Sequence, residues 1–218
     1  MINSNVDIYP IWKPKDMTSS DVVRHIKKKY DLDRVGHCGT LDPFAEGVLI
    51  LLSNDRTIEA DSFMNESKIY ETTIALGSQT DTLDPTGTIL KVDSIEFESV
   101  SKLQIEDILN NFKGEIDQRP PCFSAKRING VRLYKLARQD VFVHLKPVKV
   151  YIQEIKLISL SDRELTIGVK CGKGVYIRQL GADIAKALGT VGYLKSLTRK
   201  SIGQFNEENS INFNEFLN

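Results

Sequence analysis

Apolar residues recur at helical spacing in three stretches of the chain. Residues 19–30 and 102–112 each carry one apolar face, and Ser101 begins a capping box ahead of the second stretch. A third such stretch lies between Gly174 and Gly189, and Gly189 is placed to end it. The pattern therefore predicts three amphipathic helices.

Apolar and polar residues alternate strictly at residues 148–152 and 165–171, as they do in half-buried β-strands. Helical and strand patterns follow one another in mixed order. We therefore predict an α+β fold in which helices flank a mixed, mainly antiparallel sheet, formed by residues 1–218 as a single domain. Two longer segments, 31–46 and 114–131, show neither pattern, and we expect them to be irregular loops that carry function.

Composition narrows the class of protein only slightly. The 29 basic residues balance the 29 acidic ones, and the three cysteines lack the spacing of a zinc site or a disulfide framework. The longest apolar run, 48–52, is too short to span a bilayer. These features predict a cytoplasmic protein that is not embedded in a membrane.

Basic residues gather in the 119–138 segment, which contains no acidic residue. Such segregation suits contact with phosphates, although a solvated basic surface is the simpler interpretation of any one cluster. The six basic residues are Arg119, Lys126, Arg127, Arg132, Lys135 and Arg138.

The most unusual stretch is residues 34–49, RVGHCGTLDPFAEGVL, between a predicted helix and an apolar run. Its glycines and its Asp-Pro pair indicate a shaped backbone. Without further information, Asp42 and Pro43 start a turn and His37 is an ordinary polar residue. Cys38, if accessible beside this loop, would be sensitive to oxidation.

This stretch resembles the catalytic motif of the TruB family of pseudouridine synthases, a Gly-His-x-Gly-x-Leu-Asp-Pro-x-Ala-x-Gly sequence that holds an essential aspartate. The resemblance continues, in family order, from about residue 8 to residue 205. It includes Lys13-Pro14, Ile69-Tyr70, the stretch 80–87, the residues 120–138 of an RNA-gripping thumb, Gly174 to Arg178, and Leu194 to Leu197.

The resemblance implies the pseudouridine synthase fold and a tRNA substrate, with the target at position 55 in the TΨC loop. It implies no cofactor and no metal, and we expect a monomer without an obligate protein partner. Many relatives continue into a small RNA-binding domain of the PUA type. Because this sequence stops at Asn218, we expect that domain to be missing.

The resemblance also assigns roles to individual residues. Asp42 is implied as the catalytic carboxylate, and Arg178 as the guanidinium that keeps it ionised. Tyr70 is implied to stack on the extruded uracil and to remove its C5 proton, although a core aromatic is the simpler interpretation. The implied substrate-binding residues are His37, Tyr176, Leu197, Lys13, Lys126, Arg127 and Arg132.

His37 would take the place of the flipped base in the RNA stack, Tyr176 would buttress the pocket, and Leu197 would press on the uracil. By sequence pattern alone, Leu197 belongs to the core. Lys13 and the basic residues 126–138 are expected to face phosphates.

Two other functions stay open at this point. The chain could be the synthase subunit of a guide-RNA-dependent enzyme, which shares the aspartate motif. It could also be a tRNA-binding or RNA-folding chaperone without catalytic activity, although an intact Asp42, Tyr70 and Arg178 argue against that.

Overall fold

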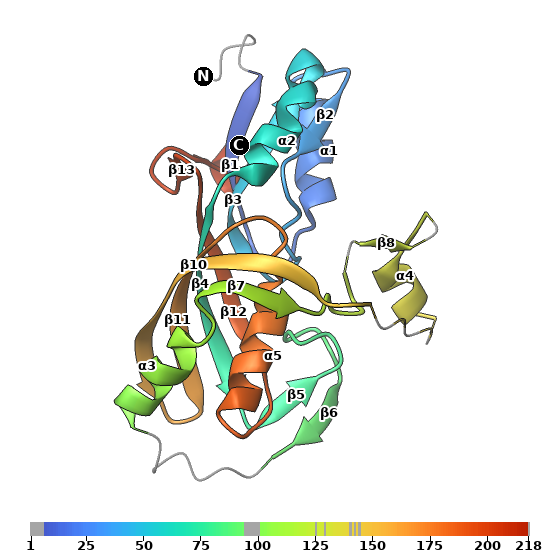
Figure 1. The fold of residues 1–218 in the computed structure, drawn as a ribbon. Helices are drawn as coiled ribbons and strands as arrows, with labels where there is room; N and C mark the ends of the chain where they lie inside the picture. Colours follow the sequence, from blue (N-terminus) through green and yellow to red (C-terminus); the bar gives the residue numbers. More distant parts are fainter. Residues whose placement is uncertain are drawn as a thin grey trace. The chain divides into compact units, whose positions relative to one another are not determined.

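The computed structural model describes residues 7–93, 101–124, 126–128, 130–139, 141, 143 and 145–217. The chain folds as two compact units (Figure 1). The first unit comprises residues 1–71 and 197–218, and the second comprises residues 72–196. Strands β4 (Lys68–Leu76) and β12 (Gly192–Ile202) contribute residues to both units.

The first unit is built on a mixed sheet in the order β14-β1-β3-β12. Strand β3 pairs antiparallel with β1 and with β2, and parallel with β12. Its elements are β1 (Ile8–Lys13), α1 (Ser19–Lys29), β2 (Val35–His37), β3 (Glu46–Ser53), the 3-10 helix η1 (Asn54–Glu59), α2 (Ala60–Asn65), β13 (Phe205–Asn206), β14 (Ile211–Asn212) and α6 (Phe213–Leu217).

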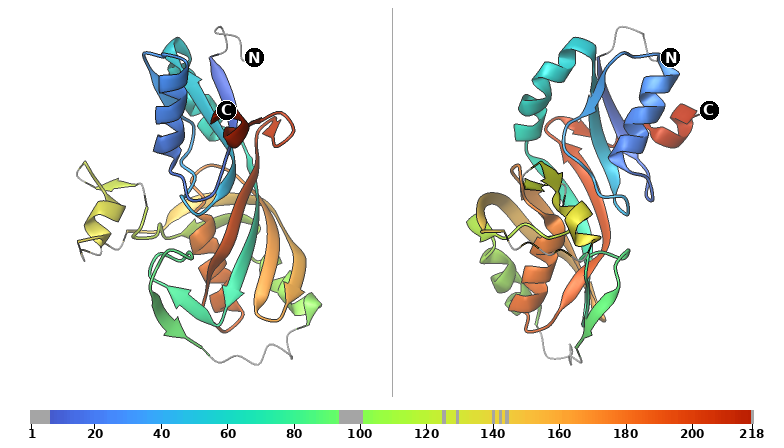
Figure 2. Two further views of the ribbon diagram at one scale, coloured as in Figure 1. Left: turned by 180° about the vertical axis from the view of Figure 1, so that it is seen from behind. Right: turned by 90° about the vertical axis from the view of Figure 1, so that its right-hand side faces the viewer.

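Strand β3 is apolar along its length because both of its faces are covered. Leu49 and Leu51 join one buried cluster with Ile26 of α1, whereas Val48 and Ile50 join another on the opposite face. Helices α1 and α6 lie side by side (Figure 2), and the rings of His25 in α1 and Phe213 in α6 meet edge to face with 5.6 Å between their centres.

The second unit contains the strands β4, β11, β10 and β7 in neighbouring order, and β10 pairs antiparallel with both β11 and β7. Two small hairpin sheets, β5–β6 and β8–β9, accompany them. Its other elements are β5 (Ser78–Thr80), β6 (Ile89–Val92), α3 (Lys102–Asn110), β7 (Gly114–Gln118), β8 (Arg127–Ile128), β9 (Val131–Arg132), α4 (Leu133–Ala137), β10 (Val148–Ser161), β11 (Glu164–Cys171) and α5 (Ile177–Ala187).

Helix α5 packs closely in the second unit because Gly181 has no side chain. A Cβ atom at that position would lie 2.5 Å from Leu194 Cδ2 and 3.4 Å from Ile74 Cγ1. Glycine therefore lets α5 approach β4 and β12, and the N-terminal turn of the helix holds Arg178.

The sequence predictions hold for all three helices and both alternating strands, which are α1, α3, α5, β10 and β11. The predicted capping box before α3 is present, with Ser101 and Gln104 each bonded to the backbone of the other. The mixed, mainly antiparallel sheet flanked by helices is confirmed. That residues 1–218 form one domain stays a prediction.

One prediction of irregular structure is partly wrong. Residues 114–118 form β7 and pair with β10 in register from Gln118↔Val148 to Gly114↔Ile152. Residues 31–46 are irregular apart from β2 and the start of β3. Among the residues that the structure describes, no helix is long and apolar enough to cross a membrane.

Candidate active site

Asp42 lies in the loop between β2 and β3 and is partly exposed. Its carbonyl accepts a hydrogen bond from the Ala45 amide at 3.1 Å, which closes a tight turn through Pro43. Asp42-Pro43 therefore does start a turn, as the dipeptide alone indicates, and the turn presents a carboxylate.

The backbone is fastened on both sides of Asp42. On one side, the Leu41 amide donates to Ser19 Oγ at 3.0 Å, and the same hydroxyl donates to the Leu41 carbonyl at 3.1 Å. On the other side, the Pro43 carbonyl accepts from the Asp16 amide at 2.8 Å. A backbone N–H or C=O group without a hydrogen-bond partner lowers the stability of the folded protein. These bonds therefore hold the loop in one conformation.

A buried cation, Lys13, supports the same loop. Its side chain is fully buried, and Nζ donates to the carbonyls of Met17 at 2.7 Å and of Pro43 at 3.3 Å, as well as to Pro14 at 2.7 Å. The expectation that Lys13 faces a phosphate is therefore wrong, because these carbonyls hold its ammonium inside the protein.

Burial, together with the nearby guanidinium of Arg199, lowers the pKa of Lys13 from 10.5 to about 8. The carboxylates of Asp42, Asp16 and Glu46 act in the opposite direction and favour its charged form. Lys13 is thus within electrostatic reach of Asp42.

Arg199 is a second buried cation that sequence reasoning missed. Its Nε donates to the Val48 carbonyl at 2.7 Å and its Nη2 to the Gly39 carbonyl at 3.1 Å. Its backbone runs so close to Gly47 that a Cβ atom there would lie 2.3 Å from the Arg199 carbonyl oxygen. Gly47, with φ of +117°, is the residue type that this approach requires.

Other predicted site residues lie in the first unit. His37 ends β2, pairs with Leu51 of β3 and is partly buried, whereas Tyr70 in β4 and Leu197 in β12 are buried. Cys38 is fully buried, and burial raises the pKa of its thiol to about 11. The condition for oxidation sensitivity, an accessible thiol, is therefore not met at Cys38.

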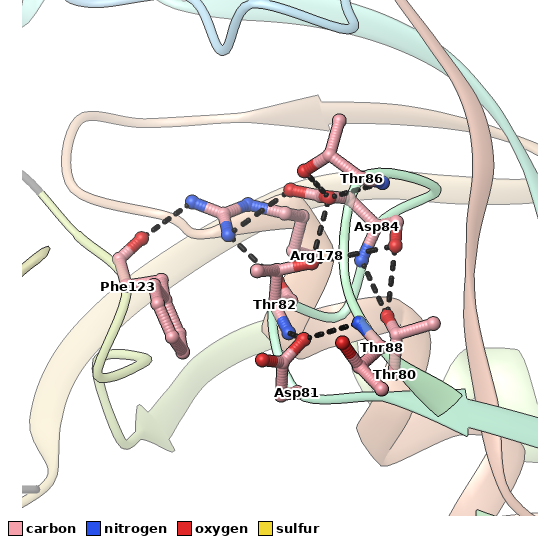
Figure 3. Close-up of polar contacts among 8 residues, drawn as sticks. All are labelled: Thr80, Asp81, Thr82, Asp84, Thr86, Thr88, Phe123 and Arg178. Atoms are coloured by element: carbon pink, nitrogen blue, oxygen red, sulfur yellow. Dashed lines mark hydrogen bonds and ion pairs between the residues drawn. The ribbon is translucent and has the colours of Figure 1, made fainter. Parts of the chain in front are cut away.

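Arg178 and Tyr176 lie in the second unit, at the start of α5. Tyr176 is the N-cap residue and is partly buried, and Arg178 is buried in the first turn. Arg178 Nη1 donates to the Thr82 carbonyl at 2.7 Å and lies 3.3 Å from Asp84 Oδ2 (Figure 3). Nη2 donates to the Phe123 carbonyl at 2.8 Å.

Asp84 is a partner of Arg178 that sequence reasoning did not single out. Its Oδ1 accepts from the hydroxyl of Thr82 at 2.7 Å and from the hydroxyl and amide of Thr86 at 2.6 and 3.0 Å. Thr80 Oγ1 donates to the Asp84 carbonyl at 2.8 Å and accepts from its amide at 3.1 Å. This turn, visible in Figure 3, presents a fixed carboxylate to the guanidinium.

The predicted pairing of Arg178 with Asp42 stays a prediction, because the two residues belong to different units. A signal for Asp84 was present in the sequence. Four threonines and two aspartates within residues 80–88 are more hydrogen-bonding groups than a simple turn needs.

Most basic residues of the 119–138 segment lie in or directly beside the hairpin β8–β9 and helix α4, whereas Arg119 follows β7. Arg132 and Lys135 line a hollow of about 350 Å³ together with Tyr134. Arg132 is exposed and Lys126 is partly exposed, while the side chain of Arg127 lies outside the described part of the structure. Arg138 lies over the Tyr134 ring, 5.6 Å from its centre.

Within the described residues, no group of three or more His, Cys, Asp or Glu side chains is arranged to hold a metal ion.

Comparison with known proteins decides the family. The profile described as "TruB family pseudouridylate synthase (N terminal domain)" matches residues 27–177. The chain is 41% identical over 207 residues to tRNA pseudouridine synthase B of Aquifex aeolicus (strain VF5), covering 94% of this chain and 71% of that protein. The chain belongs to the TruB family. It is also 42% identical to tRNA pseudouridine synthase B of Clostridium acetobutylicum over 204 residues, covering 94% of this chain and 70% of the relative.

A solved structure supports the fold of this TruB family chain. The crystal structure of a Cbf5-Nop10-Gar1 complex matches with a TM-score of 0.73 and 27% identity, and the match covers 97% of this chain. The chain spans about half of that protein, 53% of its length. Together with the family match, this likeness confirms the expected pseudouridine synthase fold.

Proposed function

We propose that this chain isomerises uridine to pseudouridine in tRNA, that its target is position 55 in the TΨC loop, and that Asp42 is its catalytic carboxylate. The family relatives named tRNA pseudouridine synthase B support the reaction and the substrate class. One observation carries the assignment of Asp42: the backbone is hydrogen-bonded on both sides of this carboxylate, at Leu41 and at Pro43. Such preorganisation is what a reacting group needs.

The reaction is an isomerisation. The bond between N1 and C1′ breaks, the uracil turns, and a bond forms between C5 and C1′. The proton on C5 leaves and N1 gains one, so atoms and electrons balance without an oxidant or a reductant. A carboxylate beside an extruded base is suited to this chemistry, either as a nucleophile or as a base.

The other site residues take supporting roles in the proposal. Arg178 keeps Asp42 ionised, because a guanidinium favours the charged form of a neighbouring carboxyl. Tyr70 stacks on the uracil, and its hydroxyl removes the C5 proton. His37 replaces the flipped base in the stack. Tyr176 buttresses the pocket and Leu197 presses on the apolar face of the uracil.

Lys126, Arg127 and Arg132 bind the phosphates of the tRNA in this proposal, and the 119–138 segment acts as the thumb. The exposure of Arg132 and its place beside the hollow at Lys135 support that role. Lys13 has a structural role in this proposal and does not bind a phosphate. It holds the loop of Asp42 from inside the protein.

The direct test is tritium release from tRNA transcripts labelled at C5 of uridine, followed by mass mapping of the product. We expect release from an unmodified transcript and none from a transcript with cytidine at position 55. Release at other uridines would retain the reaction and overturn the position. No release from any transcript, with tRNA still bound, would favour a tRNA-binding or RNA-folding chaperone.

One observation favours a second candidate, a guide-RNA-dependent synthase subunit. The Cbf5 protein that resembles this chain was solved in a complex with Nop10 and Gar1. The two functions separate in a reaction that contains only this chain and a tRNA transcript. Turnover there supports the stand-alone enzyme, whereas turnover only after addition of guide RNA and partner proteins supports the second candidate.

We further propose that the protein acts as a monomer in the cytoplasm. The reaction described above, with this chain and a tRNA transcript alone, then needs no protein partner. Light scattering during size-exclusion chromatography should give 24.6 kDa for the free protein, the mass of one chain. With tRNA bound, it should give the mass of one chain plus one tRNA. A mass of two chains would contradict the monomer.

A further inference from the structure

Two contacts join the base of the 119–138 segment to the first turn of α5. At one end of residues 118–123, the Gln118 side chain binds both backbone groups of Tyr176: Nε2 donates to the carbonyl at 3.1 Å, and Oε1 accepts from the amide at 2.8 Å. At the other end, the Phe123 carbonyl accepts from Arg178 Nη2 at 2.8 Å. Gln118 is 1% exposed, so these bonds form away from solvent.

The stretch between the two contacts is short and stiff. Pro120 and Pro121 lie within it, and both are buried. Proline fixes φ and removes a backbone donor, so the chain has little freedom between Gln118 and Phe123. A displacement of Phe123 therefore cannot be taken up by flexible backbone between Gln118 and Phe123.

Phe123 is also linked in the other direction, to helix α4. The next carbonyl along the chain, that of Ser124, accepts from the Tyr134 amide at 3.1 Å, and the Lys126 carbonyl accepts from the Leu133 amide at 2.8 Å. Successive peptide groups thus connect Arg178 to the first turn of α4. That helix is anchored by the buried Leu133, and Lys135 on it is exposed to solvent.

The far side of the guanidinium is held rigidly. Asp84 and the Thr82 carbonyl fix Nη1, and the hydroxyls of Thr82 and Thr86 in turn fix the Asp84 carboxylate. Arg178 therefore lies between the turn of residues 80–88 and the Phe123 carbonyl (Figure 3), and the residue after Phe123 is hydrogen-bonded to α4.

The Ser124 side chain, next to the contact at Phe123, is also buried. Its hydroxyl is buried, and within the described part of the chain it has no hydrogen-bond partner.

We propose that residues 118–124 couple RNA binding by the 119–138 segment to the orientation of the Arg178 guanidinium, and that Gln118 is a positioning residue for catalysis. RNA that binds Lys135 and Arg132 displaces α4, and the Phe123 carbonyl transmits this displacement to the Arg178 guanidinium. Gln118 is the fixed pivot, because it ties the end of β7 to the residue that caps α5. The proposal rests on the proposed function, since it concerns the same reaction.

Gln118→Met tests the pivot, because methionine keeps the length and the volume of the side chain and removes both hydrogen bonds. Gln153→Met makes the same change at an exposed position of β10 and serves as the matched control. We expect Gln118→Met to lower the single-turnover rate at saturating tRNA about tenfold or more, with the dissociation constant within about threefold, and Gln153→Met to change neither.

A double-mutant cycle separates coupling from a merely structural role. In the wild type, Lys135→Ala should lower the rate at saturating tRNA about threefold or more, because the pull on α4 weakens. In Gln118→Met, adding Lys135→Ala should weaken binding without a further loss of rate. Multiplicative losses in the double variant would overturn the coupling, and so would a wild-type rate in Gln118→Met.

Two controls keep the outcomes distinct. If Gln118→Met does not fold, Gln118→Glu replaces it. The glutamate can still accept from the Tyr176 amide but cannot donate to the Tyr176 carbonyl. We expect this variant to lower the single-turnover rate at least threefold. If the wild-type chain itself makes no pseudouridine, the proposed function fails rather than the coupling. In that case, unchanged hydrogen exchange at residues 176–180 on binding tRNA would also overturn the coupling.

Discussion

The hydroxyl of Ser19 binds both backbone groups of Leu41, the residue before Asp42: it accepts from the amide at 3.0 Å and donates to the carbonyl at 3.1 Å. Ser19 is the first residue of α1, so a helix end and the loop of Asp42 are joined by one buried side chain. The position of the carboxylate therefore depends on a residue that does not react.

Ser19→Ala should reduce both stability and turnover. The change leaves the Leu41 amide and carbonyl without this partner, which costs about 1–3 kcal/mol of unfolding free energy. We expect turnover to fall by more than the population of folded protein does, because Asp42 loses its fixed position. Urea unfolding and single-turnover assays measure the two effects. Ser20→Ala, at the exposed neighbouring position, should change neither, and equal effects of the two variants would argue against the role of Ser19.

Lys13 makes stability depend on pH in a defined direction. Its pKa is about 8 in the folded protein and 10.5 as a free side chain. Below pH 8 the Lys13 side chain is charged in both the folded and the unfolded protein, and above pH 10.5 it is neutral in both. Between these values the unfolded chain binds more protons, so raising the pH favours the folded state by up to about 1.4 kcal/mol per pH unit.

The comparison that isolates this effect is wild type against Lys13→Met in urea unfolding from pH 7 to pH 9.5. The difference in unfolding free energy should shift in favour of the wild type as the pH rises through 8. Lys27→Met, at an exposed position of α1, provides the control and should show a constant difference. A constant difference for Lys13→Met as well would mean that Lys13 does not titrate in this range.

Asp84→Asn should impair the reaction through Arg178. The two side chains are each 7% exposed, and replacing the carboxylate by an amide removes the negative charge that lies 3.3 Å from the buried guanidinium. We expect a loss of turnover of about tenfold or more and a lower melting temperature. The measurement is the single-turnover rate at saturating tRNA.

Asp81→Asn is the matched control, because Asp81 Oδ1 accepts from the Thr82 and Thr88 amides, and an asparagine oxygen can do the same. Its rate should stay within about threefold of wild type. If Asp84→Asn retained the wild-type rate, the ion pair with Arg178 would have no part in the reaction.

Arg132→Ala should weaken tRNA binding and flatten its dependence on salt. If Arg132 neutralises one phosphate, the slope of log affinity against log salt should become shallower by about 0.7–0.9. Filter binding at several salt concentrations measures it. Lys102→Ala removes an exposed charge of α3, outside the 119–138 segment, and should leave the slope unchanged. An unchanged slope for Arg132→Ala would place that residue on an ordinary solvated surface.

Local chemistry explains which predictions from sequence succeeded. The start of α3 was predictable because Ser101 and Gln104 are three residues apart and bind each other's backbone. The site residues at 37–42 came from the family resemblance, because composition alone does not separate Asp42-Pro43 from a common turn. The family itself is confirmed.

Contacts between distant residues explain what sequence reasoning missed. Lys13 was expected at a phosphate, yet one of its acceptors is Pro43, thirty residues away. β7 looked irregular because Gly114 and Asp117 are poor strand formers, and its pairing with β10 overrides that preference. Asp84 looked like part of a turn, and only the approach of Arg178 reveals its charge partner.

The measurement that tests the account most directly is pseudouridine formation by Asp42→Asn, with tRNA affinity determined on the same preparation. Asparagine keeps the shape of the side chain and removes the charge, so binding should stay within about tenfold, or 1.4 kcal/mol, of wild type. The account predicts less than about a hundredth of the wild-type single-turnover rate, with Asp31→Asn, at an exposed position, unaffected. Turnover of Asp42→Asn above that level would contradict Asp42 as the essential carboxylate.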